Sequence, residues 1–156
     1  MLIINGKIYT MEEMHGKNGY IENGYVRANG RYIEEVGMMS QLRPIARKEK
    51  VLDVRGAWVL PGIIESHCHI GISEEKVSVL GDSCNEGTNP VTPTMRAIDA
   101  INPMDSAFHN ALAVGITGVM VGPGSANAIG GQFAFIKTYG RCIDDMIVLA
   151  PAAIKI

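Results

Sequence analysis

The stretch 58–71 constrains the fold of this chain more than any other. An apolar run meets a Pro-Gly pair, continues as Ile63-Ile64 and reaches two histidines, His67 and His69, one residue apart. Short apolar runs bounded by chain breakers are typical of buried strands. In an extended strand alternate side chains share a face, so the two imidazoles project the same way, about 7 Å apart along the strand.

Two imidazoles on one face of a strand can converge on one metal ion, because histidine is the commonest protein ligand for transition metals. Histidines of this kind also occur in surfaces and cores without any ligand. Glu65 has the same parity as His67 and His69, whereas Cys68 points to the opposite face. We therefore expect Cys68 to pack structurally and the two histidines to be metal ligands.

Composition limits the remaining possibilities. The chain has 156 residues, of which 47% are hydrophobic and 19% charged, as in a folded domain with a core. A net charge of −2 predicts no nucleic-acid partner and no anionic membrane partner. No apolar run reaches the length of a membrane span, and the first residues lack the features of a signal peptide. Three cysteines without paired spacing predict free thiols and a cytoplasmic location.

Residues 1–57 are predicted to form a β-rich segment. Asn5-Gly6 and Asn29-Gly30 each lie between apolar runs, which is the pattern of a two-residue hairpin turn. A short helical stretch is expected within 38–50, and a strand at 51–54. His15 lies in the polar loop between the two hairpins and is expected to be solvated.

After the histidines, the sequence predicts a short helix, a long loop and a second helix. Ser73 is a candidate cap for a helix over 73–77, because two acidic residues follow it. Residues 81–93 are rich in turn formers and predict a long loop, which either covers a site or only connects its neighbours. A further helix is expected to begin at Asn102-Pro103.

This second helix is expected to end at Gly115, with His109 off its apolar stripe and without a function. The apolar run 116–121 then predicts a buried strand. A strand, a helix and a strand in this order predict a parallel pair, which needs a crossover connection. Two further strands are expected, over 133–138 and 146–151.

The glycine-rich segment 122–132 follows the strand 116–121. It lacks the Lys-Ser/Thr ending of a phosphate-binding loop. We expect a substrate-facing loop in which Ser125, Asn127 and Gln132 hydrogen-bond a substrate amide or carboxylate. A purely structural turn is the alternative.

These motifs resemble the amidohydrolase superfamily, whose first barrel strand reads Pro-Gly-apolar-apolar-Asp-x-His-x-His, with Glu65 here in place of Asp. The segments 85–93 and 122–132 together are similar to a bacterial, imidazolonepropionase-like branch. The resemblance covers nearly the whole chain and implies an α/β fold. It implies a partial (β/α)₈ TIM-type barrel over 58–156, preceded by a small β-sandwich segment over 1–57.

The resemblance also implies one or two Zn²⁺ or Fe²⁺ ions, held by His67 and His69. Glu65 would orient a ligand histidine or the neighbouring backbone. In several branches a lysine at the end of a middle barrel strand is carbamylated and bridges two metals. Lys155 matches that place, although a solvated lysine is the alternative. The implied reaction is hydrolysis of a C–N bond in a small cyclic amide or amide by metal-activated water.

A whole barrel of this type takes about 250 residues, and this chain ends after three or four predicted strands. The family's later ligands, two histidines and an aspartate, have no counterpart here. We therefore expect the N-terminal part of a longer hydrolase, inactive alone, that forms oligomers or pairs with a missing C-terminal portion. The alternatives are an inactive fragment or assembly unit that retains the metal-binding strand, and a metal-storage module.

Overall fold

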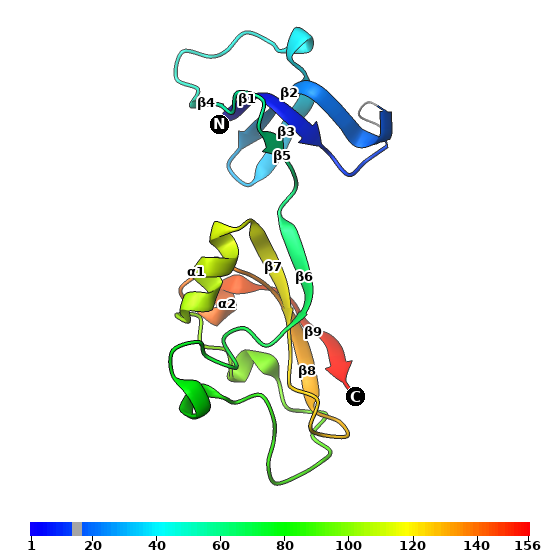
Figure 1. Ribbon diagram of the computed structural model, residues 1–156, viewed down its shortest axis with the longest axis vertical. Coiled ribbons are helices and arrows are strands. Elements are labelled where there is room, and N and C mark those ends of the chain that lie inside the picture. Colours follow the sequence, from blue (N-terminus) through cyan, green and yellow to red (C-terminus); the bar gives the residue numbers. More distant parts are fainter. Residues whose placement is uncertain (14–16) are drawn as a thin grey trace. The chain divides into compact units, whose positions relative to one another are not determined.

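The computed structural model describes residues 1–13 and 17–156 and divides the chain into two compact units (Figure 1). Unit 1 comprises Met1–Pro61 and unit 2 comprises Gly62–Ile156. The predicted boundary between residues 57 and 58 lies before Trp58–Val59, which pairs within unit 1. His15, expected to be a solvated loop residue, lies outside the described residues.

Unit 1 is built around one five-stranded sheet. Its strands are β1 (Leu2–Tyr9), β2 (Tyr20–Asn29), β3 (Tyr32–Met38), β4 (Val51–Asp53) and β5 (Trp58–Val59). They follow the order β3-β2-β1-β4, and β5 also pairs with β1. The hairpin predicted at Asn29-Gly30 is confirmed, and Gly30 supplies the positive φ of 57° that its turn requires. The described residues of unit 1 form a single sheet, so the sandwich remains a prediction.

The hairpin predicted at Asn5-Gly6 is wrong, because β1 runs through this pair as one strand. Asn5 has the positive φ of a turn residue, 58°, but the chain does not reverse there. Its side chain donates to Asp53 Oδ1 at 3.0 Å, and the register with β2 shifts on either side of Gly6. Because β1 pairs with three neighbouring strands, Asn5-Gly6 forms an irregularity within the strand and not a hairpin turn.

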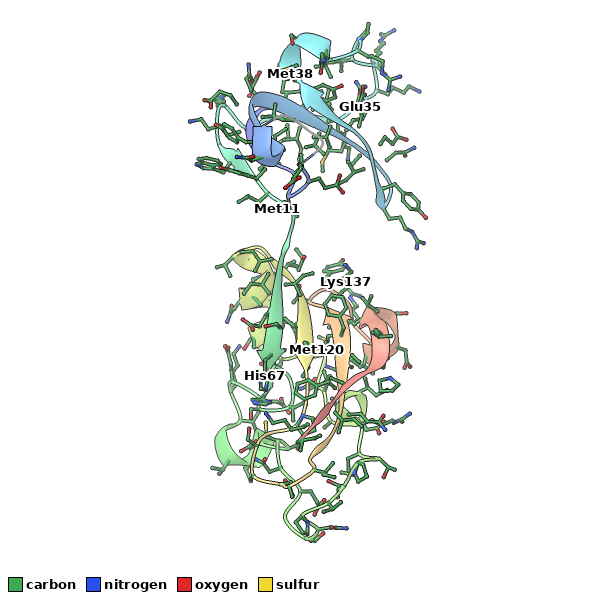
Figure 2. The ribbon with its side chains drawn as sticks, turned by 90° about the vertical axis from the view of Figure 1, so that its right-hand side faces the viewer. Met11, Glu35, Met38, His67, Met120 and Lys137 are labelled. Atoms are coloured by element: carbon green, nitrogen blue, oxygen red, sulfur yellow. The ribbon has the colours of Figure 1, made fainter. Side chains whose placement is uncertain are left out.

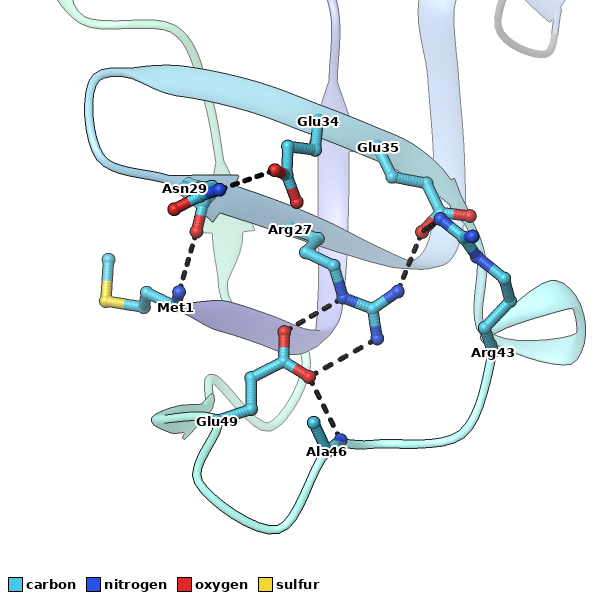
Figure 3. A network of polar contacts seen from close by, with 9 residues as sticks. Met1, Arg27, Asn29, Glu34, Glu35, Arg43, Ala46 and Glu49 are labelled. Carbon is cyan, nitrogen blue, oxygen red and sulfur yellow. Dashed lines mark hydrogen bonds and ion pairs between the residues drawn. The ribbon is translucent and has the colours of Figure 1, made fainter.

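A polar network holds the segment that follows β3 against the sheet of unit 1 (Figure 3). The Arg27 guanidinium donates to Glu49 at 2.9 Å and to Glu35 at 2.8 Å, and its side chain is only 11% exposed. Arg43 donates to Glu35 at 3.0 Å. These contacts lower the pKa of Glu35, mainly through Arg43, and that of Glu49, mainly through Arg27. Both carboxylates are therefore charged in the folded protein at neutral pH.

Unit 2 contains a four-stranded sheet in the order β6-β7-β8-β9. Its strands are β6 (Ile63–Cys68), β7 (Ile116–Val121), β8 (Gly131–Lys137) and β9 (Ile147–Lys155). The predicted parallel pairing of β6 with β7 is confirmed, whereas β8 is antiparallel to both of its neighbours. The connection 122–130 is too short for a crossover helix, which explains the reversal. The fold is mixed α/β, and the partial barrel remains a prediction.

Two short α-helices complete unit 2, α1 (Ser106–Ala113) and α2 (Ile143–Met146). The helix expected from Asn102 begins later, because Asp105 is the cap and accepts from Ala107 N–H at 3.1 Å. Gly115 follows α1 with a φ of 89°, as predicted. The core beneath the sheet is apolar and includes Ile72, Phe108, Val119, Val121, Ile136 and Met146.

The helix predicted over 73–77 is absent, and a 3₁₀ helix, Ser78–Gly81, follows instead. Ser73 does not cap a helix, because its hydroxyl donates to Asp82 Oδ1 at 3.0 Å. The Glu75 carboxylate accepts from Ser106 and Asn110 of α1, each at 3.2 Å. Side-chain contacts with α1 thus replace the expected local helix. The predicted loop over 81–93 is confirmed.

Candidate metal centre

The predicted ligand residues meet at one end of the unit 2 sheet, where the strands finish; this end is called the site edge. The parallel strands β6 and β7 both end there, with Cys68 paired with Val121. The double reversal through β8 brings the end of β9 to the same edge, since Gly131 pairs with Lys155. The carboxyl ends of three strands therefore present their residues together.

His67 and His69 lie side by side at this edge. Their ring centroids are 5.3 Å apart and their planes meet at 81°. His67, near the end of β6, is exposed (Figure 2). His69 follows β6 and is half-buried. Lys155 Nζ lies 3.4 Å from His67 Nε2 although 88 residues separate them. The structure thus brings together the three residues that the sequence suggested as ligands.

The orientation of His69 is set by a backbone carbonyl. Its Nδ1 lies 2.7 Å from Gly122 O. A carbonyl oxygen only accepts, so we assign the ring proton to Nδ1, which leaves the lone pair on Nε2 free. A ligand histidine characteristically makes such a bond through its second nitrogen.

Glu65 and Cys68 differ in their roles. Glu65 Oε1 accepts from the His67 backbone N–H at 3.1 Å, so it contacts the neighbouring backbone and not a histidine ring. The Cys68 thiol lies on the other face, 3.6 Å from Met120 O, and packs against the core. Burial raises the pKa of this thiol, which favours its neutral form. Cys68 is therefore a packing residue, as its strand parity predicts.

The donor atoms suit a transition metal. Two imidazoles favour Zn²⁺ or Fe²⁺. The Lys155 amine, with N–H groups to donate, makes a polar contact with His67 Nε2. No group of three His, Cys, Asp or Glu side chains that could hold a metal occurs within residues 1–13 and 17–156. A zinc site usually takes at least three protein ligands. The two imidazoles are therefore fewer protein ligands than such a site usually takes.

Two loops beside this edge are joined along much of their length. Thr92 N–H donates to Ile129 O at 2.8 Å, and Ile129 N–H donates to Pro90 O at 3.1 Å. Gly124 N–H donates to Cys84 O at 2.7 Å. The loop that precedes α1 and the loop between β7 and β8 therefore form one hydrogen-bonded layer.

The three predicted substrate-binding residues lie in or beside this layer. Ser125 is exposed, whereas Asn127 is only 9% exposed. The Asn127 amide donates to Glu86 O at 2.8 Å and Asn89 O at 3.2 Å, and Gln132 donates to Pro93 O at 3.2 Å. The Asn127 amide thus links the two loops, and the Gln132 amide joins β8 to the long loop. The role of these residues toward a substrate stays a prediction.

Asp82 fixes the start of the long loop. Its carboxylate accepts from the Cys84 N–H at 3.1 Å and the Ser73 hydroxyl at 3.0 Å, which holds the pKa of Asp82 below its usual range. Burial raises the pKa of Cys84, whose sulfur lies 3.0 Å from Ser73 Oγ. Both effects stabilise the charged carboxylate and the neutral thiol.

Comparisons with known proteins give a consistent family. The chain is 34% identical over 145 residues to amidohydrolase tasK of Hapsidospora irregularis, which covers 87% of this chain. It is 37% identical over 70 residues, or 42% of its length, to an imidazolonepropionase of Rhizobium meliloti. An amidohydrolase structure from Thermotoga maritima MSB8 superposes on 98% of the chain with a TM-score of 0.84 and 33% identity. The chain belongs to the amidohydrolase superfamily.

This amidohydrolase chain corresponds to the N-terminal portion of its larger relatives. It spans 15% of the Hapsidospora protein, 16% of the Rhizobium protein and 37% of the Thermotoga chain. No family model matches the chain. Among the described residues, no helix is long and apolar enough to cross a membrane.

Sequence reasoning missed two residues that shape the site. Gly122 contributes a carbonyl oxygen, and such a backbone contact has no residue-type signature. Phe133, predicted only as part of a strand, places its ring 5.4 Å from the His67 ring. The strand alternation in 131–137 could have indicated which of its residues face the site edge, but only after the register with β7 was known.

Proposed function

We propose that this chain supplies the first ligands of a metal-dependent amidohydrolase that cleaves a C–N bond in a small amide or cyclic amide. The observation that carries the proposal is the convergence of His67, His69 and Lys155 at the edge where three strands end. The names of the relatives, amidohydrolase, imidazolonepropionase and a Bacillus thuringiensis 5-methylthioadenosine/S-adenosylhomocysteine deaminase that is 34% identical over 70 residues, support hydrolysis of this class.

His67 and His69 would hold one or two Zn²⁺ or Fe²⁺ ions, and Lys155, once carbamylated, would be a further candidate ligand. When bound, such a metal lowers the pKa of water and polarises a substrate carbonyl. Glu65 holds the backbone of His67 in place, and Gly122 fixes the ring of His69. The joined loops would border the substrate, with Ser125, Asn127 and Gln132 as candidate contacts.

We propose that turnover needs residues beyond this chain, since two imidazoles are fewer protein ligands than a zinc site usually takes. Ile63 and Ile64 on the edge strand β6 are 55% and 61% exposed, which supports pairing with further strands or an oligomer partner. A cytoplasmic location stays part of the proposal.

The test is a chelation and reconstitution assay on the chain alone and on a longer protein that contains it. After treatment with EDTA, Zn²⁺ or Fe²⁺ is restored and the release of amine or carboxylate from a panel of cyclic amides is measured. We expect metal to restore hydrolysis in the longer protein, and His67→Ala and His69→Ala to abolish it. His109→Ala, at an exposed position on α1, is the control. Hydrolysis that survives both chelation and the two substitutions would overturn the proposal.

A further inference from the structure

Gly122 contacts the end of β6, where both histidines lie. Its carbonyl oxygen accepts from His69 Nδ1 at 2.7 Å. Its own N–H donates to the carbonyl of Cys68, the residue between the histidines, at 3.2 Å. The carbonyl and the N–H of Gly122 therefore both hold the end of β6, and the carbonyl that accepts from His69 has a fixed position.

Gly122 also lies directly against the ring of Phe133. A Cβ atom at this position would overlap the ring carbons of Phe133, so only glycine fits. Phe133 is 6% exposed, and its ring meets the His67 ring edge to face, with centroids 5.4 Å apart and planes at 76°. The Phe133 ring thus lies against both Gly122 and His67.

We propose that Gly122 and Phe133 are positioning residues that set both imidazoles before a metal binds. Gly122 holds His69 as the Nδ1–H tautomer, so that Nε2 presents its lone pair at the sheet edge. Phe133 limits the rotation of the His67 ring, and the missing side chain at Gly122 is what allows the Phe133 ring to lie there. The proposal deepens the metal role given above and rests on it.

A purely structural function would require only that glycine fits the turn and that Phe133 fills the core. It would not fix the proton on one nitrogen of His69. The position of that proton therefore separates a positioning role from simple packing. Outer contacts of this kind typically change metal affinity about 10–100-fold when they are removed.

The experiment is a long-range ¹H–¹⁵N spectrum of the metal-free chain with labelled histidines. It is recorded near pH 8.5, about two units above the ordinary histidine pKa. We expect His69 to show a protonated Nδ1 and an unprotonated Nε2. Gly122→Ala should lose this pattern and bind Zn²⁺ about 10–100-fold more weakly. Gly87→Ala, where a Cβ has open space, is the matched control and should keep both.

Phe133→Leu keeps the fold testable if Gly122→Ala does not fold. It should retain the His69 tautomer, change the ring-current shift of the His67 protons and weaken Zn²⁺ binding. A protonated Nε2 on His69 in the unaltered chain would overturn the inference, as would unchanged Zn²⁺ affinity in both variants.

The two proposals fail separately, because the spectrum is taken without metal. If the chain shows the expected His69 tautomer but neither it nor a longer protein that contains it binds Zn²⁺, the contact with Gly122 is supported and the proposed function is overturned. A chain that binds Zn²⁺ through His67 and His69 with the opposite tautomer would overturn only this inference.

Discussion

Asn127 offers a sharp test of how the two loops beside the site are held. Its amide nitrogen donates to two backbone carbonyls of the long loop, and its side chain is 9% exposed. The Asn127→Asp substitution keeps the shape but replaces the donor with an oxygen that faces both carbonyls. It also buries a negative charge without a hydrogen-bond donor to stabilise it.

The expected cost follows from this geometry. An uncompensated buried charge destabilises a protein by about 3–5 kcal/mol. Asn127→Ala should cost less, about 1 kcal/mol. The loss of two hydrogen bonds of about 1 kcal/mol each destabilises the fold. Removal of the buried Oδ1 atom, which has no partner within the described part of the chain, offsets part of this loss. The predicted order of unfolding free energies is therefore wild type, Asn127→Ala and, lowest, Asn127→Asp.

The assay is urea denaturation with amide hydrogen exchange of β7 and β8 as the readout. Tryptophan fluorescence would not report on unit 2, because the single tryptophan, Trp58, lies in unit 1. Ser125→Asp adds the same charge at an exposed neighbouring position and should change stability by less than about 0.5 kcal/mol. The cost of Asn127→Asp should fall at acidic pH, where the new carboxyl is neutral. If Asn127→Asp is as stable as Ser125→Asp at neutral pH, the loop-joining role is refuted.

Three further predictions concern both units. Glu35 and Glu49 have folded pKa values below the ordinary 4.5, so the stability that their charged forms give to unit 1 should be complete above pH 4.5 and be lost as the pH falls through the folded values. Urea unfolding followed by Trp58 fluorescence should show a smaller loss of stability at low pH in Glu49→Gln. Gly30→Ala should destabilise unit 1 by about 1–2 kcal/mol because an alanine is strained at positive φ, whereas Gly30→Asn should cost less, and equal stability of the two variants would contradict this. Gly62→Ala should destabilise unit 2 because its Cβ would overlap the Thr117 side chain. Thr117→Ala should restore only part of the loss, because the Thr117 Cβ would still lie 2.7 Å away. No rescue at all in the double variant would speak against that contact.

The sequence was informative wherever local signals and tertiary pairing agree. Asn29-Gly30 forms its hairpin because β2 and β3 pair with each other directly across the turn, whereas Asn5-Gly6 lies within a strand that pairs with β2, β4 and β5. The strand parity of His67 and His69 correctly placed their rings together. Local chemistry therefore predicts an element best where no long-range pairing competes with it.

The remaining parts of the site depend on register and backbone atoms. Lys155 reaches His67 only because β8 reverses the chain and Gly131 pairs with Lys155. The antiparallel pairing of β8 was missed because a parallel barrel was expected. Asn102 and Asp105 are both good capping residues, and each accepts a backbone N–H two residues further on, from Met104 at 3.0 Å and from Ala107 at 3.1 Å. Only Asp105 is followed directly by α1. None of these contacts follows from residue spacing alone.

The most direct measurement of the central claim is a Zn²⁺ titration of the metal-free chain and three single variants. We predict that the unaltered chain and His109→Ala bind Zn²⁺ stoichiometrically, and that His67→Ala and His69→Ala each lose this binding, because the two neighbouring imidazoles act on one ion. Circular dichroism of each variant would show that the fold is retained. Equal Zn²⁺ binding by all four proteins, or none by the unaltered chain, would contradict the assignment of His67 and His69 as metal ligands.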